Sequence, residues 1–134
     1  MEKEKNSNKK TKIMAVGDIH GDSGLVRRLV EKAKKENVDI VILAGDLTFL
    51  GQPVKNIIKP FVEANKQVLV IPGNHEEEET SKIFSEVYSG TKNLHGYYLI
   101  KNDVGIFGAG GATNVGPFIK EDEEIFKLLK RSNE

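Results

Sequence analysis

Three short polar clusters in this 134-residue chain contain residue types that bind metal ions. Asp18 and His20 lie in the first cluster, Asp46 in the second, and Asn74 and His75 in the third. Two carboxylates, an amide oxygen and imidazole nitrogens form a mixed oxygen and nitrogen ligand set, which suits Mn, Fe, Zn or Co. If the fold brings the clusters together, they predict a site for divalent cations.

The spacing of the clusters is regular. Asp46 follows Asp18 by 28 residues, and Asn74 follows Asp46 by 28. That interval is the length of one strand-plus-helix unit in a parallel sheet. A glycine precedes the first polar residue of each cluster, at positions 17, 45 and 73. A residue without Cβ allows a sharp turn and a close approach of ligand to backbone, so we expect a turn at the start of each cluster.

Each cluster directly follows an apolar segment rich in β-branched residues. These segments, Ile13–Val16, Val38–Ala44 and Val68–Ile71, have the near-continuous apolar pattern of strands covered on both faces of a parallel sheet. The carboxyl ends of such strands meet at one edge, where open α/β sheets bind their ligands. The pattern therefore predicts that the three clusters share that edge.

Helices are predicted between and after these strands. They are Leu25–Ala33 behind a capping residue (Asp22 or Ser23), Val54–Val62 with a kink or break at Pro60, and a weaker segment from the acidic run Glu76–Glu79 to about Tyr88. Beyond them, Tyr97–Lys101 and Val104–Phe107 flank Asn102-Asp103, which predicts an antiparallel hairpin. Gly108–Gly116 is expected to be a loop, followed by a last helix at about residues 120–131. The predicted fold is α/β: a parallel βαβαβα sheet, then a hairpin and a C-terminal helix.

Composition excludes several classes of protein. Twenty Lys and Arg balance 20 Asp and Glu, so net charge does not favour nucleic acid as a partner. The longest apolar run, Ile40–Ala44, is too short to span a membrane, so we expect no membrane partner. The absence of cysteine excludes disulfides and thiol chemistry and favours the cytoplasm. We expect residues 1–11 to form a disordered basic tail and residues 12–134 to form one domain.

The segments Asp18-Ile19-His20-Gly21, Gly45-Asp46 and Gly73-Asn74-His75-Glu76 resemble the first three signature motifs of the calcineurin-like metallophosphoesterases. The resemblance covers about residues 12–111. It implies that the chain forms half of a four-layer α/β sandwich. It also implies hydrolysis of phosphate mono- or diesters with two divalent ions (Mn, Fe, Zn, Ni or Co). It also implies that Asp18 and His20 hold the first ion, Asp46 bridges both, and Asn74 holds the second. His75 would face the phosphate and help the leaving oxygen depart, supported by Glu76.

The chain also departs from the family pattern. No histidine follows His95, so three imidazole ligands that the later family motifs would supply are absent, and we expect impaired activity. Phe49 stands where many relatives place a second aspartate. The chain resembles the N-terminal half of a family member, either truncated or completed by another copy or chain.

Two other functions remain open from the sequence. A non-catalytic metallophosphoesterase-like module could act through protein contacts or self-association, because a sheet face without its usual partner leaves an apolar patch. A Rossmann-like nucleotide binder would need a glycine-rich turn after Val16, which is a weaker match to this chain. We expect His95 to be a surface or turn histidine and Gly108–Gly111 to form a flexible rim.

Overall fold

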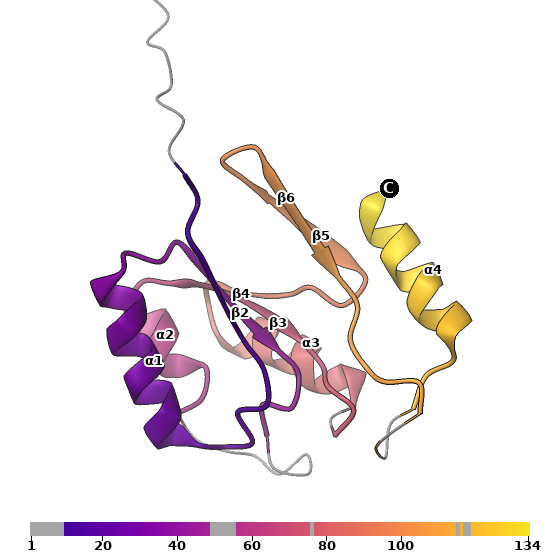
Figure 1. The fold of residues 1–134 in the computed structure, drawn as a ribbon, viewed down its shortest axis with the longest axis horizontal. Coiled ribbons are helices and arrows are strands. Elements are labelled where there is room, and N and C mark those ends of the chain that lie inside the picture. The colour runs from indigo at the N-terminus through magenta and orange to yellow at the C-terminus, as the bar shows by residue number, and fades with distance from the viewer. Residues whose placement is uncertain (1–9, 49–55, 76, 115, 117–118) are drawn as a thin grey trace, which may run out of the picture.

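A computed structural model of the chain describes residues 10–48, 56–75, 77–114, 116 and 119–134 (Figure 1). Its elements are β1 (Ile13–Val16), α1 (Ser23–Lys35), β2 (Ile40–Ala44), α2 (Lys59–Glu63), β3 (Gln67–Ile71), α3 (Glu78–Val87), β4 (Thr91–Asn93), β5 (Tyr97–Lys101), β6 (Val104–Gly108) and α4 (Asp122–Asn133). Most of the expected N-terminal tail, together with Phe49 and Glu76, lies outside the described residues.

Four parallel strands form one sheet in the order β1-β2-β3-β4. Within it, alternate side chains point to opposite faces, as the pleat of a strand requires. Val41 and Leu43 of β2 join the core that also contains α1 and α2, whereas Ile40 packs with Leu69 and Leu94 in a second core on the other face. The central strands β2 and β3 are therefore covered on both faces, as their continuous apolar pattern predicts, whereas the edge strand β1 leaves Ile13 and Ala15 exposed.

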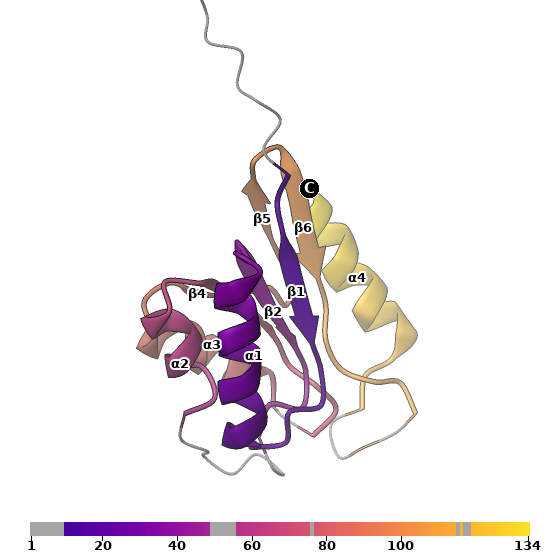
Figure 2. The same cartoon turned by 60° about the vertical axis from the view of Figure 1, so that its left-hand side comes forward.

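The molecule has four layers (Figure 2). Helices α1, α2 and α3 cover one face of the parallel sheet, and the hairpin β5–β6 covers the other through Leu99 and Ile106. Helix α4 lies on the outer side of the hairpin and contacts both of its strands. The α/β class, the parallel sheet, the hairpin and the last helix are confirmed.

Besides shifts in where strands begin, two elements, β4 and α2, differ from the prediction. The edge strand β4 is not predicted, because Thr91–Asn93 is polar and joins the sheet only through backbone pairing with β3. Pro60 does not kink a long helix but stands in the first turn of the short α2, where a missing N–H leaves no helical bond unmade. The helix predicted from Val54 therefore begins at Lys59 in the structure. Residues 49–55, which include the start of the predicted helix, lie outside the described residues.

Two local details, the cap of α1 and the hairpin turn, agree with the prediction from the sequence. The Asp22 side chain caps α1 by accepting a hydrogen bond from the Leu25 N–H at 2.8 Å. Asn102 and Asp103 have φ angles of 50° and 62°, the left-handed pair that a two-residue hairpin turn requires.

Among the described residues, no helix has the length and apolar character needed to cross a lipid bilayer.

Candidate metal centre

The loops that follow β1 and β2 lie side by side at the carboxyl edge of the sheet. The Asp18 N–H donates to the Gly45 carbonyl at 3.2 Å, and the His20 N–H donates to the Asp46 carbonyl at 2.8 Å. Between Asp18 and His20, Ile19 is 2% exposed and belongs to the core under α1. This buried anchor fixes the first loop, while the polar residues on either side of it remain available for chemistry.

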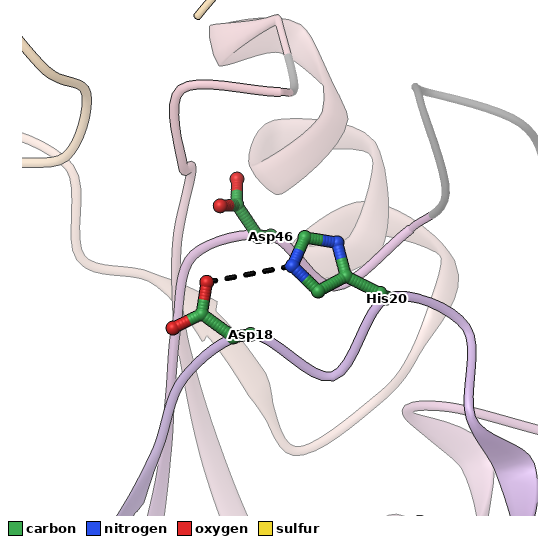
Figure 3. Close-up of side chains that lie close together, drawn as sticks. All are labelled: Asp18, His20 and Asp46. Carbon is green, nitrogen blue, oxygen red and sulfur yellow. Dashed lines mark ion pairs between the residues drawn. The ribbon is translucent and has the colours of Figure 1, made fainter. Parts of the chain in front are cut away.

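Asp18, His20 and Asp46 form a compact group at this edge (Figure 3). One potential ligand atom from each residue lies within 4.8 Å of those of the other two. His20 Nε2 is 3.4 Å from Asp18 Oδ1. Asp46 is only 8% exposed, whereas Asp18 and His20 face solvent. The arrangement gives a cation two carboxylates and one imidazole, and two of these three side chains are open to solvent.

All three members of this group have left-handed backbone conformations, with φ angles of 54° at Asp18, 47° at His20 and 49° at Asp46. Non-glycine residues adopt this region at a cost, and such residues cluster at functional sites. Aspartate tolerates it better than most residue types, whereas histidine has less local compensation. The turns at the strand ends are therefore maintained by the surrounding structure.

The third loop reaches the group through Asp46. The His75 N–H donates to Asp46 Oδ1 at 3.1 Å, which orients the buried carboxylate. Gly73 packs directly on the same carboxylate, and any side chain at this position would collide with it. The glycine expected to allow a turn thus also allows a close approach between two loops.

His75 lies beside the group, with its ring centroid 5.9 Å from that of His20 and the two rings nearly perpendicular. Its Nδ1 atom is buried and has no hydrogen-bond partner among the described residues. A buried polar atom in this state is costly unless a ligand or proton transfer uses it. The position fits a residue that acts next to the metal centre.

Asn74 stands between Gly73 and His75, but its side chain has a different neighbour. Its amide nitrogen lies against Gly116, where an added Cβ would come within 2.5 Å of that nitrogen. Among the expected site residues, the structure therefore brings Asp18, His20 and Asp46 together with His75 beside them. Asn74 lies on the same loop, and the expected supporting residue Glu76 lies outside the described residues.

His95 is at a turn, as expected, but it is buried rather than on the surface. It is 5% exposed, and its Nδ1 accepts a hydrogen bond from the Gly110 N–H at 2.9 Å. Burial lowers the pKa of His95, and the positive charge of Arg131 lowers it further. The glycine-rich segment after β6 is the one sequence feature that points to the contact between His95 and Gly110, because closely spaced glycines allow the backbone to come close to other groups.

The fold and the site define an α/β protein with a candidate metal centre at the carboxyl edge of a parallel sheet. The sequence pattern of the family described as calcineurin-like phosphoesterase matches residues 11–131, so the chain belongs to this family. No protein with a curated description matches the chain by sequence.

The fold is similar to the crystal structure of TT1561 of Thermus thermophilus, with a TM-score of 0.72 and 18% sequence identity. The similarity covers 88% of this chain and 60% of TT1561, so the chain spans less than two thirds of that protein. At this identity the likeness establishes the shared fold.

Proposed function

We propose that the chain is a metal-dependent phosphoesterase that hydrolyses phosphomonoesters or phosphodiesters with two divalent ions. The observation that carries the proposal is the convergence of Asp18, His20 and Asp46 at one edge of the sheet, within a chain of the calcineurin-like phosphoesterase family. The lack of cysteine favours action in a reducing compartment such as the cytoplasm.

The residues present fit divalent ions of the Mn, Fe, Co, Ni and Zn series. Asp18 and His20 would hold the first ion, Asp46 would contact both, and Asn74 would hold the second. A carboxylate has about four lone-pair positions, and the His75 N–H occupies only one of those of Asp46. The carboxylate therefore retains enough acceptor capacity to bridge two ions. When bound, the ions activate water near neutral pH and neutralise charge on the phosphoryl oxygens.

His75 would act on the departing group. As the bond between phosphorus and the ester oxygen breaks, the imidazole would give a proton to that oxygen, which then leaves as a neutral alcohol. Imidazole exchanges protons near neutral pH, and His75 lies next to the metal ligands without being one of the clustered group. Asp46 would hold the His75 backbone in place through its hydrogen bond.

The proposal is tested by hydrolysis of bis-p-nitrophenyl phosphate and p-nitrophenyl phosphate during titration with Mn²⁺ or Ni²⁺. We expect metal-dependent turnover that falls at least about 100-fold in Asp46→Asn, because the bridging charge is lost while asparagine still tolerates the left-handed backbone. Asp103→Asn is the matched control, since this hairpin-turn residue also has a positive φ and belongs to no metal-binding group among the described residues. Turnover that is absent with every ion, or unchanged in Asp46→Asn, contradicts the proposal.

A second candidate function, a self-association module, is favoured by the hairpin. Tyr98, Ile100 and Phe107 lie on one face of β5–β6 and are 52%, 66% and 49% exposed. Apolar side chains gathered in this way on a small domain mark a contact surface. A second copy of the chain would cover it.

A further inference from the structure

The glycine-rich loop after β6, here called the glycine loop (the described residues 109–114 and 116), packs against the segment that follows β3 and carries Asn74. The Gly111 N–H donates to the Pro72 carbonyl at 3.1 Å. Gly110 packs so closely on Pro72 that any side chain at position 110 would collide with that carbonyl. The described part of the glycine loop is therefore packed against the protein instead of forming a free rim.

The contact continues to Asn74. A Cβ added to Gly116 would lie 2.5 Å from the Asn74 amide nitrogen and 2.8 Å from its backbone oxygen. Gly116 also has a φ of +97°, which favours glycine for a second reason. The backbone of the glycine loop thus occupies the space on the nitrogen side of the Asn74 amide.

His95 ties the glycine loop to the body of the fold. Its buried Nδ1 accepts the Gly110 N–H, and its backbone follows β4, an element of the main sheet. The imidazole therefore connects the loop, at Gly110, to the same sheet whose strand β3 precedes Asn74.

We propose that the glycine loop positions Asn74 for metal binding, with Gly116 as a positioning residue. The inference rests on the proposed role of Asn74 as a ligand of the second ion. Because the Asn74 amide nitrogen lies against Gly116, the loop backbone restricts the orientations of the side chain whose amide oxygen a cation would take. A ligand whose orientation is fixed beforehand loses less conformational freedom on binding, and partners that orient ligands typically contribute about 10- to 100-fold to metal affinity.

The test compares Gly116→Ala with Gly90→Ala in the full chain by Mn²⁺ titration followed by electron paramagnetic resonance. Gly90 is a matched control because its φ is +82° and an added Cβ would meet nothing within 4 Å. Both variants bear the strain of alanine at positive φ, but only Gly116→Ala disturbs Asn74. We expect Mn²⁺ affinity to fall about 10-fold in Gly116→Ala and to change less than about twofold in Gly90→Ala. Equal affinities in the two variants overturn the inference.

A double-mutant cycle with Asn74→Ala separates this inference from the proposed function. We expect Asn74→Ala to weaken Mn²⁺ binding and Gly116→Ala to add no further loss in its presence. If Asn74→Ala binds Mn²⁺ as the wild type does, Asn74 is not a ligand and the proposed second-ion site fails. If the two losses are additive, Gly116 acts independently of Asn74 and the positioning role is wrong.

A measurement on the wild type does not depend on the folding of a variant. Nuclear magnetic resonance relaxation of the Asn74 side-chain amide in metal-free protein should give an order parameter near that of rigid backbone, about 0.85. A value below about 0.6 would show a mobile side chain and would also overturn the inference.

Discussion

The environment of His95 sets its protonation state. Burial lowers its pKa first, and Arg131 lowers it further. The Glu78 carboxylate, 3.6 Å from Nε2, would favour the charged imidazole, but Lys120 already pairs with that carboxylate. The neutral ring also keeps Nδ1 as the acceptor for the Gly110 N–H, which a protonated ring cannot be. His95 is therefore held neutral in the folded protein.

This depressed pKa predicts a pH dependence of stability. In acid the unfolded chain binds a proton at His95 more readily than the folded chain does, so the free energy of unfolding should decrease as the pH falls below about 6.5. The slope for one proton is at most about 1.4 kcal/mol per pH unit. Urea unfolding at pH 8, 7, 6 and 5 measures it.

His95→Gln is the comparison variant, because glutamine offers an acceptor to the Gly110 N–H but does not titrate in this range. We expect the difference in unfolding free energy between wild type and variant to shrink as the pH falls from 7 to 5. A difference that is constant across this range would show that His95 does not titrate differently on folding.

At the residue scale, part of the candidate site could be predicted from the sequence. The types and spacing of Asp18, His20 and Asp46 placed all three at one sheet edge, because each directly follows a parallel strand. The contact between Asn74 and Gly116 joins segments 42 residues apart through an irregular loop, and no periodic pattern encodes such a contact. The burial of His95 likewise depends on the glycine loop, whose path the sequence leaves open.

At the scale of elements, the start of α1 connects the loop that carries Asp18 and His20 to the helical layer. Asp22 satisfies one of the free N–H groups of the first turn. We expect Asp22→Ala to lower the free energy of unfolding by about 1 kcal/mol and Asp22→Ser to preserve most of it, because serine also caps helices. Urea unfolding of the three proteins measures this, and equal midpoints for wild type and Asp22→Ala would refute a stabilising cap.

Elements with strong apolar patterns were predictable, and those defined by pairing alone were not. The strands β2 and β3 and helix α1 bury most of their apolar side chains, so their apolar pattern identifies them, and β1 has the same apolar composition at the edge of the sheet. β2 nevertheless begins at Ile40 rather than Val38, because the Val38 N–H bonds to the Ala33 carbonyl in the turn after α1. β4 has no apolar pattern, and its existence depends on the adjacent β3.

At the scale of the whole molecule, the outer layer is the least completely covered. Helix α4 contacts the hairpin, but Phe126 of the helix and Ile100 of the hairpin are each 66% exposed. A hollow of about 260 Å³ lies between the hairpin and the end of α4, lined by Tyr98, Ile100 and Phe107 among others. This layer is the surface through which a second copy would bind.

Sedimentation equilibrium of the wild type, Ile100→Lys and Ile83→Lys tests this surface. We expect the wild type to dimerise and Ile100→Lys to weaken dimerisation at least about 10-fold, because a lysine charge would be buried at the contact. Ile83 is the matched control, since it is 52% exposed on α3, on the opposite side of the sheet. A wild type that stays monomeric at high concentration rules out self-association.

The order of strands in the sheet follows the order of the chain, and each strand pairs with the next one synthesised. The loops of the candidate metal centre all lie between residues 18 and 75, so they are synthesised before the hairpin that covers the second face of their sheet. The glycine loop emerges only afterwards. During translation, then, Asn74 would be the last of these residues to reach its final orientation, and the site would mature from its N-terminal side.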